Sequence, residues 1–243
     1  MTAYTIFGCG RVGLNIAHYL EAYGHTVDLI SRRDLEAGRA ACIERVQRAD
    51  VIAAAIPDDQ LSVWRDAWRC EFRESQIVIH FSGAVSVAGA HSVHPLYSFP
   101  QSTLPIARMK EIAFACSPSA PAFETVFPGL PNRNFIIKES DRARYHALAV
   151  LAGNLPAFIW NNALKELSSL ADTPAEDIIE SYLTSIIERF AENPTGSMTG
   201  PVARRDRTTV TRNLQGLEGA GDLKRLYEAF LDAAWPDFDA SGD

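Results

Sequence analysis

The sequence predicts an α/β fold in which a doubly wound, mostly parallel sheet is followed by a smaller all-helical domain. In the first half of the chain, short apolar runs alternate with helical stretches, which is the pattern of a parallel sheet covered by helices on both faces. After about residue 138 no convincing strand follows, and the pattern is helical. We therefore expect two domains, at residues 1–138 and 139–243.

Seven apolar runs are expected to form strands, because each run is short and continuous, as in strands buried on both faces. They are residues 3–7, 25–30, 50–56, 76–81, 91–96, 111–117 and 134–138. The helices expected between the first four strands are residues 11–23, 34–48 and 58–70. Asp58 follows Pro57 directly, so we expect it to cap the third of these helices.

The second half of the chain is expected to consist of helices. They are residues 140–170, 174–191, 206–217 and 221–234. Pro156 interrupts the first of them, where a proline should kink or break a helix. Residues 192–201 are rich in Gly, Pro and Ser, which predicts a loop.

The composition is ordinary for a globular protein, with 47% hydrophobic and 22% charged residues. A net charge of −7 leaves no basic field, so we expect neither nucleic acid nor a membrane surface as a partner. No uninterrupted apolar run approaches the roughly 20 residues of a membrane span. The four cysteines have neither disulfide nor metal-ligand spacing. We expect a cytoplasmic protein with reduced thiols and no bound metal.

A glycine motif follows the first expected strand and opens the first helix. Gly8, Gly10 and Gly13 have the spacing GxGxxG. Gly8 permits a tight turn, Gly10 lets a pyrophosphate approach the backbone, and Gly13 lets the helix pack closely on the strand. A purely structural turn is the alternative. The position at the first strand–helix junction favours a Rossmann-type dinucleotide site, in which Arg11 and Val12 also take part.

The end of the second strand indicates which dinucleotide is bound. NAD sites usually have an acidic residue there that bonds the ribose 2′-OH. Here the strand is expected to contain Asp28 and to end in Ser31, Arg32 and Arg33. A hydroxyl and two guanidinium groups suit a 2′-phosphate, which favours NADP(H) over NAD. The alternative is a pair of solvated arginines at a helix start.

The third strand ends at Ile56 and Pro57, which we expect at the same edge of the sheet, over the nucleotide crevice. Asp58 and Gln60 are candidates for contact with the ribose or the adenine. Capping of the helix explains Asp58 equally well.

Three stretches resemble a known group of proteins: "IVIHFSGAVS", "GAHSVHPLYSF" and "MTGPVARRDRTTVTRNLQGL". They are similar to Rossmann-like proteins whose helical C-terminal part is catalogued as domain of unknown function 2520. That group resembles pyrroline-5-carboxylate reductase, ketopantoate reductase and 6-phosphogluconate dehydrogenase in layout. The resemblance implies an NADP-linked oxidoreductase, often a homodimer, with ketopantoate as the leading particular substrate.

Polar residues at the ends of the fourth and fifth strands are the candidates for the reaction site. Ser82 offers a hydroxyl, and Gly83 can expose a backbone N–H to a substrate carboxylate. His94 has the pKa range that suits protonation of a developing alkoxide or amine. The alternative is a strand-end histidine bonded to backbone and a serine in a turn. For His80, inside an apolar run, we expect a structural histidine with satisfied hydrogen bonds.

The helical half is expected to supply the other wall of the site. By the resemblance, Asn154 bonds the reacting carbonyl oxygen. The lysine found in several relatives four residues earlier is Val150 here, so a proton must come from elsewhere, such as His94. Arg204 is a candidate clamp for a substrate carboxylate, and Asp206 is expected to cap the next helix.

The function expected from these residues is reduction of a small keto acid or imine by NADP(H). The small-molecule substrate lies between the two domains in this hypothesis. The alternative is a sensor or scaffold that binds NADP without chemistry, which the absent lysine favours. Polar groups at two adjacent strand ends favour the enzyme.

Overall fold

The computed structural model describes residues 1–170, 172 and 174–239. The chain divides into two compact units, Met1–Gly153 and Asn154–Asp243, which are described separately below. From the sequence we placed the domain boundary at residues 138 and 139, where helical character begins. The first unit also contains the helix that follows this point.

The first unit is built on a seven-stranded sheet with the order β2-β1-β3-β4-β5-β6-β7. The strands are β1 (Ala3–Phe7), β2 (Thr26–Ile30), β3 (Val51–Ala54), β4 (Ile77–His80), β5 (His91–Pro95), β6 (Phe114–Cys116) and β7 (Asn134–Ile136). All neighbouring strands are parallel except β5 and β6. The expected α/β fold with a mostly parallel sheet is confirmed. The strand order reverses beside β1, which places a crevice outside the carboxyl ends of β1 and β3.

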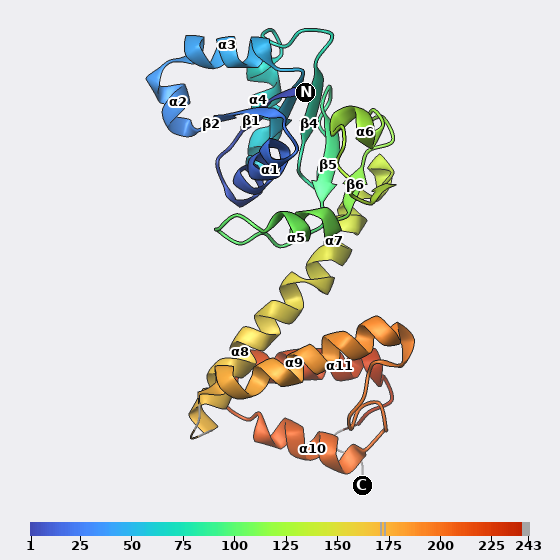
Figure 1. Cartoon of the computed structure of the whole chain (residues 1–243). Helices are drawn as coiled ribbons and strands as arrows, with labels where there is room; N and C mark the ends of the chain where they lie inside the picture. Colours follow the sequence, from blue (N-terminus) through green and yellow to red (C-terminus); the bar gives the residue numbers. More distant parts are fainter. Residues whose placement is uncertain (171, 173, 240–243) are drawn as a thin grey trace. The chain divides into compact units, whose positions relative to one another are not determined.

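Helices cover both faces of this sheet (Figure 1). They are α1 (Arg11–Ala22), α2 (Arg32–Ala37), α3 (Arg39–Arg48), α4 (Asp58–Trp68), α5 (Ile106–Glu111), α6 (Phe123–Val126), the 3₁₀ turn η1 (Glu139–Asp141) and α7 (Arg142–Ala152). Alternate strand residues enter two separate cores. Ile6 packs with residues of α1, α5 and α6, whereas its neighbour Phe7 packs with residues of α3 and α4. The sheet is therefore doubly wound.

Three expected elements of the first unit differ in the structure. The helix expected at 34–48 is two helices, because Gly38 between them has a φ of +158°. The strand expected at 111–117 is shortened to β6, because α5 occupies residues up to Glu111. Asp58 does begin α4, but the capping position is Pro57 and no side chain caps the helix.

The second unit contains only helices among its described residues. They are α8 (Asn154–Leu170), α9 (Ala175–Glu192), the 3₁₀ turn η2 (Pro194–Gly196), α10 (Arg207–Gly216) and α11 (Asp222–Ala234). A small core of Val202, Val210, Leu231 and Trp235 holds it together. Asp206 caps α10 as expected, with its carboxylate accepting from the Thr209 N–H at 3.1 Å.

The helix expected over residues 140–170 breaks at Gly153 and not at Pro156. Pro156 instead lies in the first turn of α8, where a missing backbone N–H costs no helical hydrogen bond. By length and composition alone, the stretch Glu139–Leu170 also passes as a candidate membrane span, whereas we expected none from the sequence. A single such stretch is weak evidence, because core helices of globular proteins pass the same test.

Because α1 packs closely on the sheet, an alanine should lower stability much more at Gly13 than at Gly10. A Cβ on Gly13 would lie 2.0 Å from the carbonyl oxygen of Gly8, whereas a Cβ on Gly10 would meet nothing within 4 Å. We expect Gly13→Ala to lower the free energy of unfolding by about 1–3 kcal/mol, the usual cost of overpacking. Gly10→Ala should change it by less than about 1 kcal/mol. Urea denaturation followed by circular dichroism measures both, and equal losses would contradict this account.

Candidate functional site

The glycine-rich turn joins β1 to α1 at the carboxyl edge of the sheet. Gly8 has a φ of +108°, and a Cβ there would lie 2.2 Å from the carbonyl oxygen of Ala55. Gly8 and Gly13 therefore bring α1 and the end of β3 into backbone contact, which larger residues would prevent. Gly10, at the N-terminal cap of α1, faces open space. The turn leaves the helix N-terminus accessible, as an anion site requires.

A cavity of about 470 Å³ opens beside this turn. Its wall includes six of the predicted cofactor residues: Gly8, Gly10, Ser31, Arg32, Ile56 and Pro57. The remaining lining residues are Phe7, Cys9, Ile30, Leu35, Ala55, Gln60, Val63, Trp64, Ala67 and Trp68. The indole Nε1 of Trp64 is buried and has no partner among the described residues. A cavity with apolar walls and a few unpaired donors is typical of a small-ligand site.

Four predicted cofactor residues are not in the wall of this cavity. Arg11 is exposed, Val12 packs against the core, and Gly13 is buried under the turn. Arg33 is exposed next to Arg32, at the start of α2. The structure thus brings the glycine-rich turn and the end of β2 together at one cavity. Arg32 lies in the wall of this cavity, and Arg33 lies outside it.

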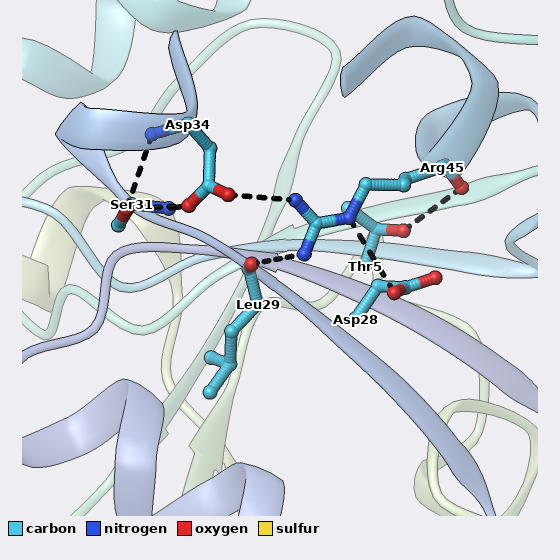
Figure 2. A network of polar contacts seen from close by, with 6 residues as sticks. All are labelled: Thr5, Asp28, Leu29, Ser31, Asp34 and Arg45. Atoms are coloured by element: carbon cyan, nitrogen blue, oxygen red, sulfur yellow. Dashed lines mark hydrogen bonds and ion pairs between the residues drawn. The ribbon is translucent and has the colours of Figure 1, made fainter. Parts of the chain in front are cut away.

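Ser31 belongs to a network of hydrogen bonds and ion pairs at the end of β2 (Figure 2). Its hydroxyl and backbone N–H both contact the carboxylate of Asp34, and its Oγ accepts from the Asp34 N–H at 3.2 Å. Arg45 of α3 donates to Asp34 at 3.2 Å, and also contacts Asp28 and the carbonyl oxygen of Leu29. The bonds from Ser31, with help from Arg45, hold the pKa of Asp34 below its usual range.

This network changes how the end of β2 is interpreted. We expected the Ser31 hydroxyl to face a 2′-phosphate, but it caps α2 instead. Asp34 places a carboxylate close to the same point, and Arg45 neutralises it. Of the three residues named from the sequence, Arg32 is the one in the cavity wall with no side-chain partner in the described part of the chain.

Cys9 is the residue between the first two glycines, and its side chain is exposed in the cavity wall. Partial burial and the negative charge of Asp34 raise the pKa of its thiol, and Arg45 offsets part of this effect. The thiol is therefore protonated at neutral pH.

Gly83 and His94 are brought into direct contact. A Cβ on Gly83 would lie 3.0 Å from three carbons of the His94 ring, so the absence of a side chain leaves room for the imidazole. His94 lies within β5 rather than after it. Ser82 is buried, and its Oγ accepts from the N–H groups of Ala84 and Val85 at 3.2 and 3.3 Å. This is the turn that we weighed as the alternative role for Ser82.

Tyr145 of α7 completes this group, and its role was missed from the sequence. Its hydroxyl lies 2.9 Å from Nδ1 of His94, and the ring of His146 lies 6.2 Å from the His94 ring. Tyr145 and His94 are separated by 51 residues along the chain. Nothing local in the sequence links them, and the one available signal was that Tyr145 and His146 lie near the start of the first helix after the last strand.

The His94 imidazole is neutral at physiological pH. Burial, aided by the neighbouring His146 and Arg142, lowers the pKa of His94 to about 4. This pKa lies below the range that we expected for His94 from the sequence, and the role of His94 as a proton donor stays a prediction. A neutral imidazole still donates one N–H, and the hydroxyl of Tyr145 holds the other ring nitrogen.

His80 also departs from its expected role. It is fully buried at the end of β4, yet neither of its ring nitrogens has a partner among the described residues. Burial and the charge of Arg142 lower its pKa to about 4, so it too is neutral. The prediction of a satisfied structural histidine is wrong.

The candidates from the helical half lie in the second unit. Asn154 is the exposed first residue of α8, and Arg204 is exposed in the turn before α10. Each remains a prediction for the substrate site. Within the described residues, no group of three His, Cys, Asp or Glu side chains is arranged to hold a metal ion.

Comparisons with known proteins identify one family and several similar folds. Residues 115–233 match the model of the family described as domain of unknown function (DUF2520). No curated protein matches the chain. A structure from Bacteroides fragilis, provisionally described as an NADP oxidoreductase, has a TM-score of 0.76 at 20% identity and covers 96% of this chain and 97% of its own. A protein from Thermotoga maritima has a TM-score of 0.69 at 19% identity, covering 95% and 96%.

Two named enzymes have similar folds. 1-Pyrroline-5-carboxylate reductase from Streptococcus pyogenes has a TM-score of 0.59 at 18% identity, and covers 96% of each chain. A reductive aminase from Aspergillus terreus, solved with NADPH, has a TM-score of 0.58 at 16% identity, covering 96% of this chain and 91% of its own. At these identities the likeness establishes the fold. Residues 115–233 are thus similar to the DUF2520 model, and the chain has the Rossmann-like fold of these reductases.

Proposed function

We propose that this protein is an NADP(H)-dependent oxidoreductase that reduces a small keto acid, with ketopantoate as the leading example, or an imine. The observation that carries the proposal is the cavity beside the glycine-rich turn, whose wall holds Gly8, Gly10 and Arg32. The similar folds include a 1-pyrroline-5-carboxylate reductase and a reductive aminase bound to NADPH, both of which are named for reductions.

The residues around the cavity fit a dinucleotide. Gly10 leaves the N-terminus of α1 open to a pyrophosphate. Ile56 and Pro57 supply apolar wall at the end of β3. When bound, the cofactor supplies the hydride, and the protein's task is to position the substrate and stabilise charge.

The preference for NADP(H) over NAD(H) rests on Arg32 and on the charge balance at the end of β2. Asp34 lies in the first turn of α2, after the end of β2, but its carboxylate accepts from Ser31 and Arg45 and is neutralised there. An Asp in this state is a poor partner for a free 2′-OH. The Arg32 guanidinium is available to a 2′-phosphate through paired hydrogen bonds.

His94 acts in this proposal as a neutral hydrogen-bond donor to the reacting carbonyl or imine. The Tyr145 hydroxyl lies 2.9 Å from Nδ1 of His94. In the tautomer that the proposal requires, this hydroxyl donates to Nδ1 and the proton of the neutral ring is on Nε2. Gly83 fixes the ring position by leaving room for it. A tyrosine hydroxyl behind the imidazole offers a route for proton resupply, in place of the lysine that this chain lacks.

The remaining predicted site residues keep secondary roles. Ser82 shapes the loop that carries Gly83, while Asn154 and Arg204 remain candidate substrate-binding residues. The protein is placed in the cytoplasm, which its four free cysteines support.

We further propose that two copies of the chain form a homodimer through their helical units. On α9, Tyr182, Ile187 and Phe190 are 62%, 56% and 57% exposed, and large apolar side chains exposed together mark an interaction surface. A net charge of −7 disfavours an anionic membrane as the covering surface. A second copy offers the same exposed apolar side chains of α9 and can bury them against its own.

Substitution of Arg32 tests the cofactor preference. We expect Arg32→Ala to weaken NADPH binding about tenfold, the loss of one charge-assisted contact, and to leave NADH binding unchanged. Isothermal titration calorimetry with both cofactors measures this. Arg48→Ala, an exposed arginine on α3, is the control and should change neither affinity. Equal weakening of both cofactors would remove the assignment of Arg32 to the 2′-phosphate.

Substitution of Tyr145 tests the reaction site. With the best substrate from a panel of keto acids and imines, Tyr145→Phe should lower kcat about tenfold with KM within twofold, because His94 loses its orienting partner. Tyr97→Phe, at an exposed ring with no hydroxyl partner in the described residues, is the control. Because the lowered pKa keeps His94 neutral above about pH 4, the rate should show no ionisation of this group between pH 5 and 8. NADPH binding without turnover on any panel member would favour the sensor.

The oligomeric state tests the proposed dimer. Sedimentation at micromolar concentration should give twice the mass of one chain. Ile187→Glu should shift the protein to the monomer, because it buries a charge in the interface. Ser181→Glu, which adds the same charge at an exposed polar position of α9, should leave the dimer intact. A monomeric native protein would overturn the proposal.

A further inference from the structure

A buried arginine at the start of α7 is linked to the loop between β4 and β5. Arg142 is the first residue of α7, and its side chain is only 1% exposed. Its Nη1 donates to the hydroxyl of Ser92 in β5 at 2.6 Å, and that hydroxyl donates in turn to the backbone carbonyl of Ser82 at 2.7 Å. One serine hydroxyl therefore connects the guanidinium group to the turn that carries Gly83.

Arg142 is linked to the same loop at a second point. Its Nε donates to the carboxylate of Glu139 at 3.2 Å, and that carboxylate also accepts from the hydroxyl of Ser86. Ser82 and Ser86 stand on either side of residues 83–85 in the chain. The two links therefore hold the loop before and after this short turn.

The turn lies over one face of the His94 ring. A Cβ on Gly83 would lie 3.0 Å from each of three atoms of the imidazole, Cγ, Cδ2 and Cε1. A point at this equal distance from three atoms of a five-membered ring lies above the ring and not beside its edge. The position of the turn therefore decides how much room the imidazole has.

The same helix contacts the His94 ring at its edge. Tyr145 is three residues after Arg142 in α7, so the two side chains lie on one side of the helix. The hydroxyl of Tyr145 lies 2.9 Å from Nδ1 of His94. The first turn of α7 thus contacts the ring through Tyr145, and is linked through Arg142 to the turn that covers the ring.

The charge of Arg142 acts on the same imidazole. Burial, the neighbouring His146 and Arg142 lower the pKa of His94 to about 4. Asp58 opposes them to a lesser degree. A cation nearby disfavours a second cation, so Arg142 helps to keep the ring neutral. A neutral ring is the state in which His94 can act as the proposed hydrogen-bond donor.

The stability of the fold alone does not explain a charged residue at this position. Nη2 of Arg142 has no partner among the described residues, and the side chain of Glu139 is 47% exposed. Solvent screens that carboxylate, so the ion pair offsets only part of the cost of burying the guanidinium group. An apolar side chain of similar volume often gives equal or greater stability in place of a buried ion pair. The links to the loop are a role that an apolar residue would not fill.

We propose that Arg142 is a positioning residue for His94. Through Ser92 it holds the Gly83 turn over the face of the imidazole, while Tyr145 holds the ring at Nδ1. The position of the ring does not depend on the proposed function. The effect of Arg142 on turnover does rest on it, because His94 is the proposed donor to the reacting carbonyl or imine.

The first experiment measures the position of the ring by NMR in the full-length protein at neutral pH. Nuclear Overhauser effects are recorded between the His94 ring protons and the Hα protons of Gly83, with the ring signals assigned by their loss in His94→Asn. We expect about a twofold loss of intensity in Ser92→Ala, because the turn is no longer tied to Arg142 and opens locally. Ser117→Ala is the matched control and should change nothing, since Ser117 is also buried but its hydroxyl has no partner among the described residues.

Unchanged Overhauser effects in Ser92→Ala would overturn the proposal, even if the variant is less stable to heat. Should Ser92→Ala fail to fold, Arg142→Lys takes its place. A lysine keeps the charge but lacks the fork that bonds Ser92 and Glu139 together, so the same loss of intensity is expected. Arg144→Lys, at an exposed arginine of the same helix, is its control and should keep the native intensities.

The second experiment tests whether Ser92 and Arg142 affect turnover through His94. With the best substrate of the panel, Ser92→Ala should lower kcat about fivefold with KM within about twofold, the result of a misaligned donor. In a His94→Asn background the same substitution should change kcat by less than about twofold, because the group to be positioned is gone. An equal loss in both backgrounds would overturn the proposal.

The two experiments also separate this inference from the proposed function. NADPH-dependent turnover together with unchanged Overhauser effects in Ser92→Ala would sink the inference and leave the proposed function intact. Weakened Overhauser effects in a protein that turns over no panel member would support the positioning of the ring and remove the proposed function.

Discussion

The close approach of three backbone segments organises the first unit. Gly8 lets the turn after β1 touch the carbonyl of Ala55 at the end of β3, and Gly13 lets α1 rest on Gly8 itself. A side chain at either position would push these segments apart. Because β1 and β3 are the strands at which the sheet order reverses, this contact also sets the width of the crevice outside their ends. The same backbone contact therefore fixes both the fold and the cavity proposed for the cofactor.

The strand positions, the doubly wound sheet and the glycine turn were predictable because each has a local pattern. Continuous apolar runs mark buried strands, and GxGxxG has a fixed relation to the strand and helix around it. The helix break at Gly38, rather than a single helix over 34–48, and the break at Gly153, rather than at Pro156, were misjudged for a local reason. Glycine ends a helix more readily than proline does when the proline falls in the first turn.

The side-chain partnerships of the site could not be predicted in the same way. Tyr145 meets His94 across 51 residues, and Arg142 meets Ser92 across 50. In both cases a polar side chain of α7 contacts a residue of β5, and no periodicity in the sequence predicts that contact. His80 illustrates the same limit, because an apolar run predicts burial but not whether a buried ring finds partners. Ser31 was misjudged through a local motif, since the Asp three residues later forms a capping box with it.

The protonation state of the Cys9 thiol affects how readily the protein is oxidised or alkylated. The thiol is exposed in the wall of the cavity proposed for the cofactor, where an oxidised or alkylated sulfur would obstruct a ligand. Partial burial and the carboxylate of Asp34 keep it protonated, and thiols react with peroxides and electrophiles far more slowly than thiolates. Asp34, which caps α2 through Ser31, thus also protects the cavity proposed for the cofactor against oxidative damage.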